Sequence, residues 1–246
     1  MERKEFLRSL GLVGLVTPLL SACKDDDVTP ADTTSATTTS STTVDTSTTP
    51  ASCTVGDTET DGPYPLYSSR GSSIQRVDIT DGKTGVPLNI TIVVRNVKDN
   101  CNIVANARVD IWHCDKDGYY SGYSNSGYLG TQNNSSAVFC RGIQYTDTTG
   151  LAKFLSIYPG WYNGRVTHIH AQIYVGTSLK LTTQIAFPEE INTEVYKTAL
   201  YVTHGQNSTK NTSDNIIKDS LDNELATVIA NDNGGYDLTH TIYISA

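Results

Sequence analysis

The sequence has no cluster of lysine and arginine. Its 18 basic residues are outnumbered by 26 acidic ones, and the formal net charge is −8 at pH 7. Binding to nucleic acid depends on concentrated positive charge that neutralises phosphates, and binding to anionic lipid surfaces has the same requirement. The composition therefore argues against a nucleic-acid partner and against adsorption to anionic lipid.

A long hydrophobic run is also missing. The apolar stretch at residues 10–20 follows the charged residues 2–4 and is shorter than the ~20 residues that a membrane-spanning helix needs. This arrangement is typical of a secretory leader that is cleaved off. Residues 20–23, LSAC, resemble a bacterial lipobox. We expect residues 1–22 to be a lipoprotein signal peptide and Cys23 to carry the lipid, the alternative being an ordinary small-residue cleavage site.

Two further patterns bear on export. Residues 3–8, RKEFLR, resemble a degenerate twin-arginine signal in which Lys4 replaces one arginine. Residues 24–27, KDDD, resemble an acidic signal that directs some lipoproteins to the outer face of the outer membrane, and a solvated charge run gives the same pattern. We expect a lipid-anchored protein of the cell envelope, in the outer membrane and exposed at the cell surface.

Apolar residues are scarce after the leader. Residues 28–52 are almost entirely threonine and serine with some alanine, proline and aspartate, a composition that cannot bury enough apolar surface to fold. We interpret residues 23–55 as a disordered tether. Residues 56–246 are long enough for one domain with a substantial core.

Closely spaced cysteine pairs of the C-x-x-C type are absent, which argues against a zinc ribbon or finger. Four cysteines remain when Cys23 is set aside, an even number that suggests two disulfides in an exported chain. Three pairings are possible. We favour Cys53 with Cys101 and Cys114 with Cys140, which would close two sequential loops.

The chain also lacks alternating strand and helix patterns. Apolar residues repeat every second position, which is the signature of half-buried strands. Only residues 189–200 and 213–229 have a helical pattern. We therefore predict an all-β fold, an antiparallel β-sandwich with a few short helical excursions. The residues expected to share strand faces are Leu88, Ile90, Ile92 and Val94; Ala107, Val109 and Ile111; and Leu151, Leu155 and Ile157, with Lys153 as the exception.

Candidate metal ligands begin at the H-x-H pattern of His168 and His170. On a strand, alternate side chains point to the same face, so both imidazoles can reach one metal ion while Ile169, Ala171 and Ile173 face the core. Two polar histidines on a solvated face would give the same pattern. The pattern alone is a weak metal signal.

Tyrosines near this strand make the signal stronger. Residues 157–165, IYPGWYNGR, bring a tyrosine and an arginine towards the histidines, and residues 110–121 end in two adjacent tyrosines before a serine. A phenol has a pKa near ~10 and loses its proton at neutral pH when it binds a hard trivalent cation. Two tyrosines and two histidines therefore indicate ferric iron before zinc or copper.

Several segments, in order, resemble the intradiol ring-cleavage dioxygenases that act on catechol, hydroxyquinol and protocatechuate. The resemblance covers about residues 58–187. It rests on residues 60–64 (TDGPY, where the family has TEGPY), 76–79 (RVDI), 85–88 (GVPL), 107–121, 141–147 (RGIQYTD), 159–162 (PGWY), the H-x-H strand and 181–185 (LTTQI).

This resemblance assigns four ligands to Fe(III). The pattern G-x-Y-S implies Tyr120 and makes Tyr119 its neighbour, P-G-x-Y implies Tyr162, and R-x-x-H-I-H implies His168 and His170. Four protein ligands, two of them anionic, leave a fifth position for water or hydroxide. In the family the substrate displaces one tyrosinate, which we assign to Tyr162 and which would act as a catalytic base.

Further residues are implied near the iron. Arg165 precedes His168 by three residues and would stabilise negative charge on the substrate ring, the alternative being a surface ion pair. Gln184 would assist as a hydrogen-bonding group. Trp112, Trp161 and Tyr64 are candidates for an aromatic pocket, or for the core.

The resemblance implies Fe(III)-dependent cleavage of a catecholic ring by O2 to a cis,cis-muconate-type diacid. A surface-anchored β-sandwich that binds phenolics or ferric catecholates without turnover is the main alternative, and a structural adhesin without metal is a third. The chain lacks the helical N-terminal segment that builds dimers in cytoplasmic catechol enzymes, so the oligomeric state stays open. Unlike the two-subunit protocatechuate enzymes, it carries a complete ligand set by itself.

Overall fold

The computed structural model describes residues 53–65 and 73–246. The expected signal peptide, Cys23 and nearly all of the expected tether lie outside the described residues. No helix in the described ranges is long and apolar enough to cross a membrane.

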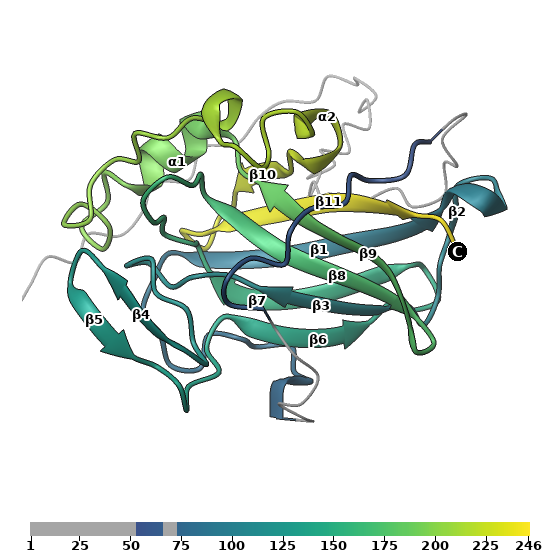
Figure 1. Cartoon of the computed structure of the whole chain (residues 1–246), viewed down its shortest axis with the longest axis horizontal. Coiled ribbons are helices and arrows are strands. Elements are labelled where there is room, and N and C mark those ends of the chain that lie inside the picture. Colours follow the sequence, from purple (N-terminus) through teal and green to yellow (C-terminus); the bar gives the residue numbers. More distant parts are fainter. Residues whose placement is uncertain (1–52, 66–72) are drawn as a thin grey trace, which may run out of the picture. The chain divides into compact units, whose positions relative to one another are not determined.

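Two stacked sheets form the domain (Figure 1). The first has the order β10-β11-β1-β2, with β7 also paired to β1, and the second has the order β6-β3-β8-β9. Strand β1 pairs in parallel with β11, and the other pairings between named strands are antiparallel. The first sheet consists of β1 (Pro87–Asn96), β2 (Asn102–Ile103), β7 (Leu151–Ile157), β10 (Thr227–Ala230) and β11 (Tyr236–Ile244), and the second of β3 (Arg108–Trp112), β6 (Arg141–Tyr145), β8 (His168–Val175) and β9 (Ser178–Ala186).

Smaller elements lie around the sheets. A separate hairpin of β4 and β5 projects from one end of the sheets (Figure 1). Helical segments are few and short, so the predicted all-β class with short helical parts is confirmed. These elements are β4 (Ser124–Gly127), β5 (Gly130–Asn133), α1 (Glu189–Val195), α2 (Leu221–Glu224) and the 3-10 helices η2 (Val97–Asp99) and η3 (Asn211–Ser213).

The core lies between the sheets because apolar side chains alternate along the strands that face each other. From β1, Ile90 and Ile92 are buried against Ile169 and Ala171 of β8 in one cluster. The expected buried faces of residues 88–94 and 107–111 are confirmed. Burial of this alternating face is the main contribution to stability, since each fully buried aliphatic side chain contributes about 1.5–3 kcal/mol.

The expected face of β7 is wrong. Leu155 is 46% exposed, whereas Phe154 is buried. The register with β1 explains this, because Phe154 lies opposite Ile90, and residues directly opposite on paired strands point to the same face. Pairing with β1 therefore buries the face of β7 that contains Phe154, although the other face has more apolar residues.

The two expected helices are also shorter than predicted. The first ends at Val195, and the second is divided into a short α2 and the strand β10. The amide of Ala226 donates to the carbonyl of Ala186 at 2.9 Å, which ties this segment to the end of β9. The β-branched residues Thr227 and Val228 then continue as a strand beside β11.

One of the two favoured disulfides is present. Cys53 is bonded to Cys101, as expected. Cys114 and Cys140 are free and buried, so the second pairing is wrong. The amide of His113, not that of Cys114, donates to the carbonyl of Cys140, which places the two cysteines one position out of register. Their thiols consequently lie in different hydrophobic clusters.

Candidate metal centre

The two histidines lie side by side at the start of β8. Both are buried, and their Nε2 atoms are 3.2 Å apart. Ile169, between them, faces the core with Ala171, as the strand alternation predicts. In the neighbouring strands Trp112 and Gln184 pair with His170, so β3 and β9 hold the imidazole pair from both sides.

Two loops bring tyrosine hydroxyls to the same point. The hydroxyl of Tyr162 is 3.2 Å from His168 Nε2, and that of Tyr120 is 3.5 Å from the same atom. The loops are joined by their backbones, because the amide of Gly160 donates to the carbonyl of Asp115 at 3.0 Å. A side chain at Gly160 would collide with the backbone of the Tyr120 loop, since its Cβ would lie 2.3 Å from a carbonyl oxygen.

The neighbouring tyrosine points elsewhere. The hydroxyl of Tyr119 donates to the carbonyl of Gly130 at 2.8 Å and accepts from the amide of Leu129 at 2.8 Å. These contacts fix the β4–β5 hairpin to the domain. The structure therefore places Tyr120 beside the histidines and Tyr119 away from them, in the arrangement that the resemblance implied.

The protonation of the imidazoles follows from their surroundings. The carbonyl oxygen of Val166 is only an acceptor, so His168 Nδ1, 2.6 Å away, donates to it and leaves the lone pair on Nε2. Burial lowers the pKa of His168 to about 3 and lowers the pKa of His170 well below its ordinary value. Both rings are neutral, and the buried Nδ1 of His170 has no hydrogen-bond partner among the described residues.

Both phenols are protonated in the absence of a metal ion. Burial raises the pKa of Tyr162 to about 12, against the opposing effect of the Arg165 charge. Burial also raises the pKa of Tyr120 well above its ordinary value. Both hydroxyls can become anionic ligands only when a strongly charged cation offsets the cost of desolvation.

These donors fit a hard, highly charged metal ion. The Nε2 atoms of two neutral imidazoles and the oxygens of two phenols converge on one point, and such a set of nitrogen and potentially anionic oxygen donors suits a hard trivalent cation. In the described residues no group of three or more His, Cys, Asp and Glu side chains is placed to hold a metal. That finding agrees with this centre, because half of its donors are tyrosines.

Aromatic rings and one glycine enclose the centre. The Trp112 ring is parallel to the His170 ring at a centroid distance of 5.0 Å, and Tyr64 lies 5.0 Å from Tyr120. On another side, a Cβ at Gly62 would be 2.9 Å from His170 Cε1. The segment 60–64, which the sequence resemblance singled out, therefore packs directly against the rings of His170 and Tyr120.

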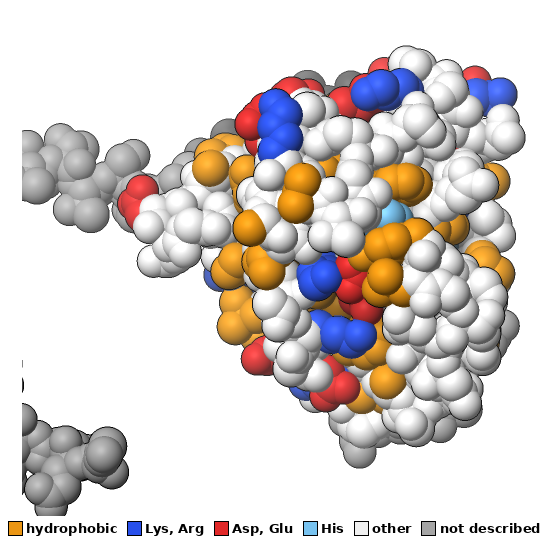
Figure 2. Space-filling model, turned by 90° about the vertical axis from the view of Figure 1, so that its left-hand side faces the viewer, with side chains coloured by type: hydrophobic (Ala, Val, Ile, Leu, Met, Phe, Trp, Pro, Cys, Tyr) orange, Lys and Arg blue, Asp and Glu red, His pale blue; other side chains and the backbone are white. Residues whose placement is uncertain are grey.

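Trp161 belongs to a different set of contacts. Its ring stacks on His204 at 4.2 Å, and His204 stacks on Tyr128 at 4.2 Å. Tyr128 is 42% exposed and connects β4 to β5, at the end of the domain where hydrophobic and charged side chains lie next to each other (Figure 2). Trp161 precedes Tyr162 in the chain, and its role in a substrate pocket stays a prediction.

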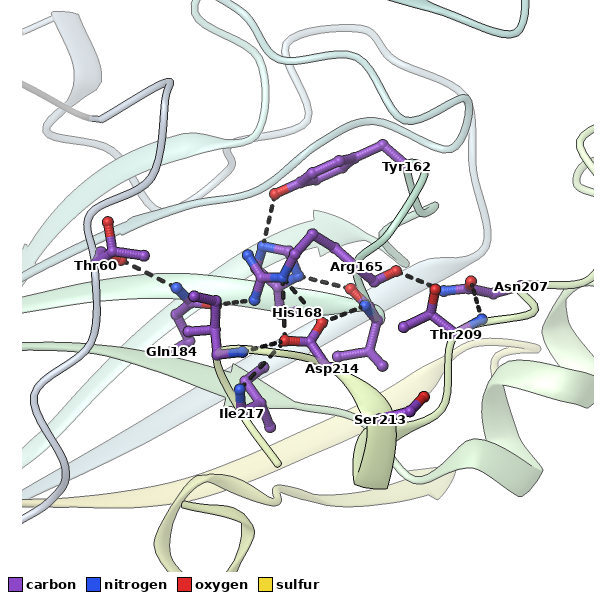
Figure 3. A network of polar contacts seen from close by, with 12 residues as sticks. Thr60, Tyr162, Arg165, His168, Gln184, Asn207, Thr209, Ser213, Asp214 and Ile217 are labelled. Carbon is purple, nitrogen blue, oxygen red and sulfur yellow. Dashed lines mark hydrogen bonds and ion pairs between the residues drawn. The ribbon is translucent and has the colours of Figure 1, made fainter. Parts of the chain in front are cut away.

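A polar network holds the arginine beside the histidines (Figure 3). Arg165 Nε donates to Asp214 at 2.9 Å, and Arg165 Nη2 donates to Gln184 Oε1 at 2.5 Å. Gln184 Nε2 in turn donates to the carbonyl of Thr60 at 3.0 Å. Arg165 and Gln184, predicted separately from the sequence, are thus in direct contact.

Asp214 was not predicted from the sequence. It lies 49 residues after Arg165, in an irregular segment between η3 and α2, and is completely buried. The sequence predicted a helix over residues 213–229, and an acidic residue near the start of a helix is common and indicates no distant partner. Only the fold brings it to the arginine.

Solved structures, and not sequence comparisons, show which known fold this domain has. No protein-family model and no curated protein matches the sequence. An intradiol ring-cleavage dioxygenase from Tetranychus urticae is structurally similar, with 23% identity and a TM-score of 0.69 over 78% of this chain and 95% of that chain. The dioxygenase domain of a carbohydrate-binding fusion protein from Streptomyces sp. SirexAA-E has 24% identity and a TM-score of 0.57 over 78% and 99%.

A third solved structure belongs to the same class. Chlorocatechol 1,2-dioxygenase from Pseudomonas putida has 20% identity and a TM-score of 0.53, over 79% of this chain and 74% of that chain. The described domain therefore has the fold of the intradiol ring-cleavage dioxygenases. At these identities the similarity establishes the fold, and any activity has to be argued from the site.

Proposed function

We propose that this chain is an Fe(III)-dependent intradiol ring-cleavage dioxygenase that uses O2 to open a catecholic ring between its two hydroxylated carbons. The product would be a cis,cis-muconate-type diacid. The observation that carries the proposal is the convergence of two neutral imidazoles and two phenols. His170 Nε2 and the hydroxyls of Tyr162 and Tyr120 all lie within 3.2–3.5 Å of His168 Nε2. The fold shared with intradiol dioxygenases supports it.

Tyr120, Tyr162, His168 and His170 would hold the metal. Bound Fe(III) would supply a Lewis acid that accepts both catechol oxygens and makes the ring reactive towards O2. The aromatic walls formed by Tyr64 and Trp112 would exclude water from the donors.

Tyr162 is the better candidate for the displaceable ligand. It is partly exposed, whereas Tyr120 is buried. As a phenolate, Tyr162 would accept a proton from a catechol hydroxyl, because burial raises the pKa of its phenol to about 12. Tyr120 has no comparable access to solvent and would remain bound.

Arg165 would stabilise negative charge on the bound substrate. Its guanidinium is fixed by Asp214 and Gln184, so it does not need to reorganise when charge develops. Of the guanidinium nitrogens of Arg165, Nε contacts Asp214 and Nη2 contacts Gln184. This fixed cation distinguishes the site from one that only binds a metal.

We also propose that Cys23 carries a lipid that anchors the protein to the outer membrane, facing the cell surface. The argument is the lipobox-like sequence at residues 20–23 and the acidic residues that follow it. Mass spectrometry of the mature protein from a bacterial envelope fraction tests this. We expect an N-terminal lipidated Cys23, and an unlipidated protein that begins elsewhere would contradict it.

A visible spectrum of the iron-loaded protein, residues 24–246, tests the enzyme directly. We expect a tyrosinate-to-iron charge-transfer band that shifts when catechol is added without oxygen and returns when air is admitted and a muconate forms. A shift without product would favour a binding module. Absence of the band after iron loading would contradict the metal site.

Two tyrosine variants make the test specific. Tyr162→Phe removes a proposed ligand and is expected to shift or abolish the band and to lower activity by at least ~100-fold. Tyr119→Phe removes a hydroxyl that contacts only the hairpin among the described residues, and is the matched control. Equal effects of the two substitutions would contradict the ligand assignment.

A further inference from the structure

Asp214 is a buried carboxylate with an unusually large number of donors. Its Oδ2 accepts from Arg165 Nε at 2.9 Å and from the amide of Val166 at 2.8 Å. Its Oδ1 accepts from the amides of Ile216 at 2.9 Å and Ile217 at 3.2 Å. Burial opposes ionisation, but these hydrogen bonds and the guanidinium hold the pKa of Asp214 below its usual range.

Two chains of contacts start from this carboxylate (Figure 3). The first runs through the Arg165 side chain to Gln184 and ends at the Thr60 carbonyl. The second runs through the backbone of Val166, whose amide donates to Asp214 at 2.8 Å and whose carbonyl, in the next peptide group, accepts from His168 Nδ1 at 2.6 Å. One side chain therefore holds both the guanidinium and the backbone of Val166, the residue whose carbonyl sets the tautomer of a candidate iron ligand.

We propose that Asp214 is a positioning residue that holds Arg165 and His168 in a single arrangement. The inference rests on the proposed function, because it gives those two residues their roles. Partners that orient metal ligands in this way commonly contribute roughly 10–100-fold to metal affinity or activity. Asp214 itself touches neither the imidazole nor the phenols through the described hydrogen bonds.

The test compares two buried aspartates that each pair with an arginine. Asp110 is as buried as Asp214 and forms an ion pair with Arg108 in the middle of β3, and its side chain has no described hydrogen bond to Arg165, Val166 or His168. Asp214→Asn and Asp110→Asn make the same chemical change. Both are expected to destabilise the fold, because each leaves a guanidinium without its carboxylate.

The first measurement uses metal-free protein labelled with 15N. We expect the wild-type His168 Nδ1–H and Arg165 Nε–H to exchange slowly with solvent, and Asp214→Asn to make both exchange at least ~10-fold faster. Asp110→Asn should leave both signals unchanged. Unchanged signals in Asp214→Asn, or equal changes in both variants, would overturn the proposal.

The second measurement uses iron-loaded protein. We expect Asp214→Asn to shift the charge-transfer band, to increase the rate of iron loss to a chelator and to lower kcat by roughly 10–100-fold, with smaller effects on KM. Asp110→Asn should stay within about 2-fold of wild type. Normal iron retention and kcat in Asp214→Asn would overturn the functional part of the proposal.

A second variant serves if Asp214→Asn does not fold. Asp214→Glu keeps the charge beside Arg165 and moves the carboxylate by one methylene, so it is expected to fold and still to alter the band and the exchange rates. Wild-type behaviour of Asp214→Glu would overturn the positioning role. Wild-type protein without band or turnover would refute the proposed function, while the exchange rates would still decide how Asp214 acts on Arg165 and His168.

Discussion

Adjacent residues in this domain have separate tasks. Tyr119 ties a hairpin to the domain through its hydroxyl, while Tyr120, one peptide further, points to the histidine pair. Composition and alternation treat the two tyrosines alike, and only the G-x-Y-S pattern distinguished them. At the residue scale, the residue type alone does not give the role of a side chain, and the hydrogen-bond partner decides it.

Gly62 offers a direct test of the contact with His170. Gly62 has φ +70°, and its added Cβ would be 2.9 Å from the imidazole. We expect Gly62→Ala to displace the ring and to weaken iron binding by at least ~10-fold, measured by competition with a chelator. The control is Gly82→Ala, since Gly82 has φ +78° with nothing within 4 Å. Equal iron affinities in the two variants would contradict the contact.

Glu224 should make stability depend on pH. Burial raises its pKa to about 7, against hydrogen bonds from Ser220 and Thr183. A carboxyl with a raised pKa keeps its proton in the folded state after the unfolded state has lost it, so its contribution falls as pH rises from about 4.5 to about 7. We expect the free energy of unfolding to fall by on the order of 1–3 kcal/mol over this pH range because of Glu224.

Denaturant titrations of Glu224→Gln at several pH values measure that contribution. The variant keeps the shape and an acceptor oxygen but cannot ionise, so its unfolding free energy should decline less between pH 4.5 and 7 than that of wild type. The exposed Glu194 on α1 provides the control substitution Glu194→Gln. Parallel pH profiles for wild type and Glu224→Gln would refute the prediction.

Whole elements could be predicted from the sequence where one face is buried and the other is not. Strand β8 was predicted with the correct face, because Ile169, Ala171 and Ile173 alternate with polar residues. Strand β7 was predicted with the wrong face, because its exposed side is also rich in leucine. Its orientation depends on the register with β1, which is a contact between distant segments.

The corrected face of β7 predicts a large difference between neighbouring substitutions. Phe154 is 1% exposed and lies in the core, so Phe154→Ala should lower the free energy of unfolding by about 3–5 kcal/mol. Leu155→Ala should cost less than about 1.5 kcal/mol, because Leu155 is 46% exposed. Urea unfolding of the metal-free domain measures both. A larger loss of stability in Leu155→Ala than in Phe154→Ala would support the buried face that was predicted from the sequence.

On the scale of the whole molecule, one disulfide joins the start of the described chain to the first sheet. Cys53 and Cys101 are separated by 48 residues, so their bond restricts a long loop in the unfolded state. We expect replacement of both by serine to cost about 2–4 kcal/mol. Thermal unfolding measures the loss, with Cys114→Ser as a variant that leaves the bond intact.

A thiol count gives an independent check of the pairing. Unreduced protein, residues 24–246, should react at two cysteines after unfolding, Cys114 and Cys140. It should react at neither before unfolding, because burial raises the pKa of both thiols. Four reactive thiols, or none, after unfolding would contradict the single bond.

Long-range partners are the part of the site that the sequence did not predict. The four candidate ligands lie in local patterns of known spacing, and for that reason they could be named in advance. Asp214 reaches Arg165 across 49 residues, and the helical pattern expected for residues 213–229 gave no indication of this contact. Such partners are set by the packing of the loops on the sheet, which no local pattern contains.

The parallel pairing of β1 with β11 affects how the protein is made. Asn89 on β1 contacts Asp237 on β11, and 148 residues separate them. A ribosome therefore completes all the other described strands before β11 exists, and until then the edge of β1 that does not face β7 and β2 is unpaired. The first sheet can close only late in synthesis. Until β11 has been made, this open edge is available to chaperones or to the edge strands of other chains.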